Sequence, residues 1–210
     1  RVKAVLYMGL PGQAGGEAIA DLLYGRINPN GKLAESWPFA YEDVPSSEVY
    51  GKTTDALYQE GVYVGYRYYD KARVPVRWPF GYGLSYTTFA YTNLRIKGKT
   101  VSVTVANTGN CSGAEVVQLY VAAPQNGIHR PLRELKGFTK VFLQPGESRT
   151  VSFELSDRSF AVWQDGWKVS GGTYTVCVGG LTVSIEKHGE TLPIPAWQGS
   201  SWYERCTGKP

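Results

Sequence analysis

Hydrophobic and polar positions change their pattern near residue 87. After that point apolar and polar side chains alternate over short runs, at residues 100–106, 114–121, 151–155, 173–178 and 181–185. Alternation with a period of two is typical of strands that bury one face. Turn-forming clusters that contain Asn, Pro or Gly separate these runs, at residues 107–109, 144–146 and 170–172. The pattern predicts an all-β sandwich of about seven short strands over residues 87–190.

Residues 1–86 carry the pattern of an α/β unit instead. Residues 2–8 (VKAVLYM) form a continuous apolar run, which is typical of a strand buried on both faces. A glycine-rich turn leads to residues 17–24 (EAIADLLY), whose apolar positions fall on one helical face before Gly25. The turn at residues 28–31 (NPNG) then precedes a second expected strand at residues 33–37.

The segments that follow are less regular. Residues 38–58 are polar and show no sustained period, so we expect a long surface loop. Residues 62–69 (VYVGYRYY) are aromatic, and we expect them to pack on a neighbouring element. Residues 191–210 are rich in Pro and aromatic side chains and are expected to form a linker or arm. A chain that begins inside an expected strand and ends on a linker is interpreted as a piece of something larger.

Charge and composition narrow the function classes. The formal net charge of +4 is small, and the 22 Lys and Arg are scattered, which argues against a nucleic-acid partner. No apolar run approaches the ~18 residues that span a bilayer, and the first ten residues do not resemble a signal peptide. We therefore expect no membrane partner and a cytoplasmic location, with secretion as the alternative if the natural amino terminus lies upstream.

The three cysteines, Cys111, Cys177 and Cys206, cannot all pair with one another and form no close metal-type pair. We interpret them as reduced thiols. Without a core disulfide and its Trp, the sandwich is expected to be of the fibronectin type III-like variety. Asn110-Cys111-Ser112 fits a glycosylation sequon, which has meaning only in a secretory pathway.

Six motifs together resemble one enzyme family. They lie in order at residues 11–21 (PGQAGGEAIAD), 28–33 (NPNGKL), 58–69 (YQEGVYVGYRYY), 79–89 (PFGYGLSYTTF), 115–121 (EVVQLYV) and 130–138 (RPLRELKGF). This series resembles the carboxyl-side region of glycoside hydrolase family 3, the β-glucosidase and related exo-glycosidase family. The resemblance implies that residues 1–86 are the carboxyl-side portion of an α/β sandwich domain, followed by a fibronectin type III-like domain.

The resemblance also implies a function. Family members use a catalytic Asp on a barrel domain and a Glu acid/base on the α/β domain in a retaining mechanism. Neither motif occurs here, so we assign no catalytic, substrate-binding or metal-binding residue and no cofactor to this chain. The implied partners are the remainder of the same enzyme and a β-glucoside or oligosaccharide substrate. Trp202-Tyr203 and residues 208–210 resemble the link to a following barrel in members with reversed domain order.

Several residues allow a functional interpretation as well as a structural one. The turn at residues 12–16 precedes a helix and could bind an anion or border an active site, although it matches no phosphate-binding fingerprint. Glu60, Arg67 and Asp70 lie among tyrosines and could serve a sugar site, but we favour a domain interface with Arg67 in an ion pair. His129 and His188 each stand alone, so we expect exposed loop residues rather than metal ligands.

Two further features bear on function. Residues 123–131 form a Pro- and Gly-containing loop that the family pattern directs at the barrel. Trp163 and Trp167 flank Asp165-Gly166, which indicates a hairpin with one Trp packed inward, or exposed rings that stack on sugars. The leading hypothesis is therefore part of a retaining exo-β-glycosidase that is inactive alone. The alternatives are a non-catalytic carbohydrate-binding module and a purely structural tandem domain.

Overall fold

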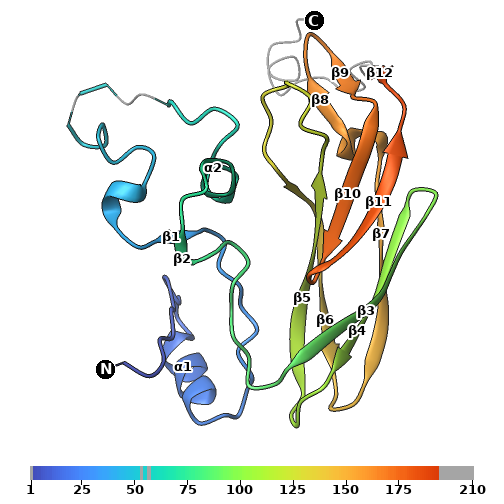
Figure 1. Cartoon of the computed structure of the whole chain (residues 1–210). Helices are drawn as coiled ribbons and strands as arrows, with labels where there is room; N and C mark the ends of the chain where they lie inside the picture. The colour runs from blue at the N-terminus through green and yellow to red at the C-terminus, as the bar shows by residue number, and fades with distance from the viewer. Residues whose placement is uncertain (1, 53, 56–57, 194–210) are drawn as a thin grey trace, which may run out of the picture.

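A computed structural model describes residues 2–52, 54–55 and 58–193 (Figure 1). Most of the strands belong to a β-sandwich, and the segments before residue 87 lie along one side of it, facing β5 and β6. The expected fold class, α/β followed by a fibronectin type III-like sandwich, is confirmed.

The sandwich consists of antiparallel sheets. One sheet has the order β11-β10-β5-β6, a second has β3-β4-β7, and a small third has β12-β9-β8. Their bounds are β3 Phe89–Lys97, β4 Thr100–Asn107, β5 Gly113–Ala122, β6 Glu134–Leu143, β7 Ser148–Glu154, β8 Ala161–Trp163, β9 Trp167–Val169, β10 Gly172–Val178, β11 Leu181–Lys187 and β12 Glu190–Leu192. A short 3-10 helix, η2 (Asp157–Ser159), connects β7 to β8.

The core fills the space between the two larger sheets. Every second residue of β4 is buried, and β10 buries Tyr174, Val176 and Val178 in the same rhythm. These side chains pack against Val117 and Leu119 of β5. The alternation visible in the sequence is therefore the alternation between core and solvent.

The strands that the sequence did not reveal have irregular patterns. In β3 the register shifts between Thr92 and Arg95, and Asn93 has a φ of 55°, so the alternation is interrupted. β6 exposes Phe138 and Phe142 on the face away from the core, so apolar residues stand where an alternating strand would have polar ones. β12 pairs with β9, so regular structure covers the first two residues of the expected linker, 191 and 192. Residues 194–210 of that linker lie outside the described residues.

The α/β portion departs further from expectation. The helix is confirmed as α1 (Gly15–Leu23), and the aromatic segment becomes α2 (Tyr66–Ala72). The prediction of a strand at residues 2–8 is wrong. A strand needs a pairing partner, and no described residue pairs with this run. The second strand shrinks to β1 (Trp37–Pro38), since its only described partner is the short β2 (Val76–Trp78). The described part of the loop at 38–58 holds one 3-10 turn, η1 (Tyr41–Asp43).

Candidate functional site

Polar and aromatic contacts join the segments before residue 87 to the sandwich, and we call this interface the domain seam. At its centre Lys32 Nζ lies 3.0 Å from Glu115 Oε2, with side chains only 15% and 13% exposed. Lys32 also donates to the Gly83 carbonyl at 2.9 Å, and Tyr91 donates to Glu115 Oε1 at 2.9 Å. Burial, followed by the charge of Glu115, raises the pKa of the Tyr91 hydroxyl. Tyr91 therefore remains a donor, and the Glu115 charge is compensated from two sides.

Asn28 forms the end of the domain seam that lies at the start of β5. Its Nδ2 donates to the Ser112 carbonyl at 3.0 Å, and its Oδ1 accepts from Ser85 Oγ at 2.9 Å and from the Tyr86 N–H at 2.8 Å. A Cβ at Gly113 would lie 2.7 Å from Asn28 Nδ2, so β5 needs glycine there. The side chain of Asn28 thus fixes both the approach to β3 and the start of β5.

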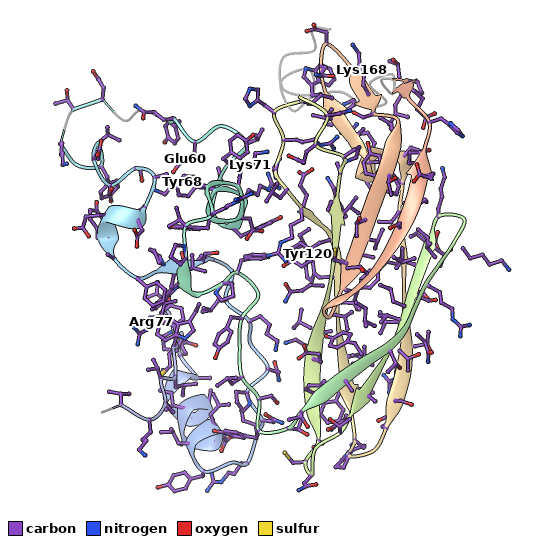
Figure 2. All side chains as sticks on the ribbon, in the orientation of Figure 1. Glu60, Tyr68, Lys71, Arg77, Tyr120 and Lys168 are labelled. Atoms are coloured by element: carbon purple, nitrogen blue, oxygen red, sulfur yellow. The ribbon has the colours of Figure 1, made fainter. Side chains whose placement is uncertain are left out.

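Aromatic rings form the other end of the seam, next to α2. Tyr66 stacks on Phe80 with ring centroids 4.8 Å apart and meets the Tyr120 ring edge-on at 5.9 Å. Its hydroxyl accepts from the Leu135 N–H at 2.8 Å. Figure 2 shows Tyr120 on the side of the sandwich that faces α2. Burial raises the pKa of Tyr120 to about 12, although the nearby Arg133 opposes the rise.

Two ion pairs flank these rings. Arg133 Nε donates to Asp70 Oδ2 at 2.7 Å, and Arg67 Nη2 lies 3.7 Å from Glu134 Oε1. Burial lowers the pKa of Arg133, but the hydrogen bond and charge of Asp70 outweigh it and the net shift is upward. Both pairs join α2 to the start of β6, so they fix α2 on the sandwich.

A groove opens beside the seam on the α/β portion. Its volume is about 750 Å³, and it is bounded by the chain around β1, by Glu60 and by α2. Its lining includes aromatic rings, from Trp37, Tyr66, Tyr69 and Phe80, and charged groups, from Glu35, Glu60 and Arg67. Figure 2 shows Glu60 close to α2. The sequence alone gave no sign that Trp37 belongs to this group, because it lies 23 residues before Glu60.

Of the three residues that the sequence grouped, Glu60 and Arg67 line the groove together, whereas Asp70 does not. Arg67 is in the expected ion pair, and Asp70 is engaged with Arg133. Glu60 faces the groove and has no hydrogen bond or ion pair to another described side chain. Tyr66 packs at the domain interface as expected, whereas Tyr68 contacts Tyr69 within its own helix. These residues therefore serve the seam and the groove.

The turn before α1 has a steric explanation. Gly12 has a φ of 70°, and a Cβ at Gly15 would lie 2.6 Å from Cβ of Pro11. These values fit the expected tight turn into a helix. His129 and His188 are exposed. Within the described ranges no three His, Cys, Asp or Glu side chains gather to hold a metal, and no helix there is long and apolar enough to span a membrane.

The loop at residues 123–131 is anchored at both of its ends. Pro124 packs near Gly172, and Lys71 of α2 donates to Gln125 at 2.7 Å. Arg130 is 97% buried, with its guanidinium 5.9 Å from the Tyr174 ring centroid. One of its nitrogens lies 3.5 Å from the Phe160 carbonyl, while Nε and Nη1 have no hydrogen-bond partner among the described residues. The loop is thus held by the sandwich and α2 together, and its tip at 125–127 is exposed.

The two tryptophans and the cysteines occupy separate places. β8 and β9 form the expected hairpin, in which Trp167 packs against the core and Trp163 is 53% exposed. The Arg158 guanidinium stacks on Trp167 at 3.4 Å. Cys111 and Cys177 are free thiols, and Cys206 lies outside the described residues. Burial raises the pKa of the Cys177 thiol, so it is a poor nucleophile.

Comparison with known families decides where the chain belongs. The Glycosyl hydrolase family 3 C-terminal domain matches residues 1–66, and the Fibronectin type III-like domain matches residues 115–182. The chain belongs to glycosyl hydrolase family 3. Five of its six family motifs, all but residues 11–21, contribute side chains to the domain seam. The signature of family 3 in this chain is therefore largely a signature of an interface.

Relatives in the family include enzymes with different names. The chain is 44% identical to an Exo-alpha-(1->6)-L-arabinopyranosidase of Bifidobacterium breve, over 93% of this chain and 28% of that protein. It is also 44% identical to Thermostable beta-glucosidase B of Acetivibrio thermocellus, over 85% of this chain and 25% of that protein. The chain thus spans about a quarter of the length of these family 3 relatives.

Solved family 3 structures have the same fold. The GH3 beta-glucosidase of Bifidobacterium adolescentis superposes with a TM-score of 0.80 and 41% identity, over 91% of this chain and 31% of that one. Beta-glucosidase 3B of Thermotoga neapolitana, in complex with glycerol, gives a TM-score of 0.81 and 40% identity, over 87% of this chain and 28% of that one.

Proposed function

We propose that this chain is the non-catalytic portion of a retaining, β-glucosidase-like exo-glycosidase that removes terminal non-reducing β-D-glycosyl residues. Its role is to hold the α/β portion and the sandwich in one fixed orientation relative to each other. The convergence of five family motifs on the domain seam carries this proposal. A retaining mechanism needs two carboxyl groups about 5 Å apart, so a shift of the supporting domains by a fraction of that distance would impair it.

The state of the seam carboxylates supports a structural role for them. Glu115 is bound to Lys32 and Tyr91, Asp70 to Arg133, and Glu134 to both Arg67 and Lys136. Each of these carboxylates already has partners within the seam, and the proposal therefore assigns the nucleophile and the acid/base to the remainder of the enzyme.

Activity assays of two proteins test this division. The purified 210-residue chain should give no turnover of an aryl β-D-glucoside at any pH between 4 and 9, whereas the full-length gene product that carries it should hydrolyse the glucoside. Turnover by the chain alone that is abolished by one carboxylate substitution in it would overturn the proposal. An inactive full-length product would do so as well.

The choice of sugar follows from the same assay. Because one relative is named an arabinopyranosidase and others are named β-glucosidases, the full-length product should be given aryl β-D-glucoside and aryl α-L-arabinopyranoside side by side. The proposal expects a higher kcat/KM for the glucoside. A higher value for the arabinopyranoside would reassign the substrate while leaving the role of the seam intact.

A further inference from the structure

The groove beside α2 has firmly placed walls. Tyr66 is held by its stack on Phe80, and the Trp37 ring meets Trp78 edge-on at 5.6 Å across the β1–β2 ladder. α2 is itself fixed on the sandwich by Asp70 and Arg133. A site built from held side chains loses little conformational entropy when a ligand binds. The volume of about 750 Å³ falls in the usual range of small-molecule sites.

The polar groups of the groove are few and unevenly satisfied. Glu60 is half-buried, and its carboxylate has no hydrogen bond or ion pair to a described residue. Arg67 forms only a long ion pair, with Nη2 3.7 Å from Glu134 Oε1, and it also lines the groove. The groove therefore presents aromatic faces together with two carboxylates and one guanidinium. The Glu60 carboxylate is unpaired among the described residues, Glu35 accepts from Trp37 Nε1 at 3.2 Å, and the Arg67 guanidinium is partly used.

We propose that this groove is a carbohydrate-binding site that takes one pyranose ring of a neutral oligosaccharide. A pyranose has an apolar C–H face that packs on aromatic rings such as Trp37, and hydroxyl groups that donate to a carboxylate such as Glu60. The assignment deepens the proposed function and rests on it, because the sugar belongs to the substrate class of that enzyme.

The alternative occupant is an apolar protein segment, which the exposed Val64 side chain in the groove lining would also accept. Such a segment would cover Glu60 and leave a buried charge without a partner, which is costly. Sugar hydroxyls satisfy a carboxylate without a counter-charge, so the free acceptor favours the carbohydrate.

Titration calorimetry of the full 210-residue chain with cellobiose tests the proposal. The expected result is saturable binding that Glu60→Gln weakens about tenfold, since a hydrogen bond to a charged group is replaced by one to a neutral group. Glu48→Gln is the matched control, because Glu48 is an exposed carboxylate outside the groove. It should leave the affinity unchanged. Trp37→Phe keeps a ring with a smaller face and should weaken binding less than Glu60→Gln.

Each outcome decides the matter. A flat titration of the unaltered chain, which is also the result expected if a protein segment fills the groove, overturns the site. Equal affinity of the Glu60→Gln and Glu48→Gln variants overturns it as well, provided that both keep the circular dichroism spectrum of the parent. Because hydrolysis is measured separately on the full-length product, failure of the groove proposal leaves the proposed function standing, and the two failures can be told apart.

Discussion

Lys32 and Glu115 are 83 residues apart in sequence, yet Lys32 Nζ and Glu115 Oε2 lie 3.0 Å apart in the interior of the domain seam. Each belongs to a different family motif, one in the turn before the β1 region and one at the start of β5. The pair has further partners in Gly83 and Tyr91, so all of these buried polar groups are used together. A connected, satisfied network of this kind specifies one relative placement of the two portions.

Breaking this pair on one side should destabilise the chain. Lys32→Met leaves the Glu115 carboxylate buried without its cation, and we expect the free energy of unfolding to fall by about 3 kcal/mol. Urea denaturation followed by tryptophan fluorescence measures the change. Arg26→Met is the control, because Arg26 pairs with Asp21 at the surface with its side chain 70% exposed, and it should cost less than about 0.5 kcal/mol. Equal losses in the two variants would contradict the buried network.

Asn107 should be as sensitive as the ion pair. It is buried, donates to the carbonyls of Cys111 and Leu143, and accepts from Thr87 Oγ1 and from the Gly109 N–H. Asn107→Ala leaves these groups without partners, and we expect a loss of about 3 kcal/mol in the free energy of unfolding.

Thr108→Ala supplies the comparison for Asn107. Thr108 is the next residue and is exposed, with its hydroxyl bonded to Thr88. Its removal should cost less than about 1 kcal/mol in the same denaturation experiment. A Thr108 variant as unstable as the Asn107 variant would mean that the turn as a whole, rather than the amide side chain, carries the stability.

Much of the sandwich could be predicted from sequence because its information is local. β4 and β10 alternate between core and solvent, and the turn at Gly179–Gly180 reverses the chain after β10. Each of these strands can therefore be recognised from a few consecutive residues. The run at residues 2–8 shows the limit of such reasoning. Its apolar character describes what a strand would bury, but strand formation also depends on a pairing partner that no local pattern reveals.

The candidate site was less predictable for a related reason. The groove gathers Trp37, Glu60 and Phe80 from three separate segments, and their proximity depends on how α2 docks on β5 and β6. One signal was present in the sequence. Glu115 is the one charged residue in a strand that is apolar apart from Gln118, which indicates a buried partner, but the sequence does not say that the partner is Lys32.

Alkaline pH should destabilise the chain through Tyr120. Its pKa rises from the usual 10.0 to about 12 in the folded chain. Between pH 10 and 12 the unfolded chain therefore releases this proton while the folded chain retains it, so stability present below pH 10 is lost as the pH rises. Two pKa units correspond to about 2.7 kcal/mol as an upper limit.

The pH effect is measured by urea denaturation at pH 9, 10 and 11. Tyr120→Phe should make the decline less steep, although Tyr91 adds a loss of the same sign because its pKa is also raised. Tyr58→Phe alters an exposed side chain and should leave the slope as it is. An unchanged slope in the Tyr120 variant would show that its hydroxyl titrates alike in the folded and unfolded chains.

Adjacent glycines in the β10–β11 turn give a test of the packing around Tyr91. Gly179 and Gly180 have φ values of 55° and 85°, so alanine is strained at both positions. A Cβ at Gly179 would also lie 2.3 Å from Cγ of the Tyr91 ring, whereas a Cβ at Gly180 meets no atom within 4 Å. The Tyr91 ring cannot withdraw freely, because its hydroxyl is bonded to Glu115.

Gly180→Ala should therefore cost about 1 kcal/mol, from backbone strain alone, and Gly179→Ala about 3 kcal/mol or more, from strain and overpacking together. Thermal and urea denaturation of the two variants measure the difference. Adding Tyr91→Ala to Gly179→Ala should remove the overpacking, so the double variant should lose less stability than the sum of the single changes. If the two changes add fully, the ring of Tyr91 is not what restricts position 179, and the hydroxyl of Tyr91 does not hold that ring in place against the turn.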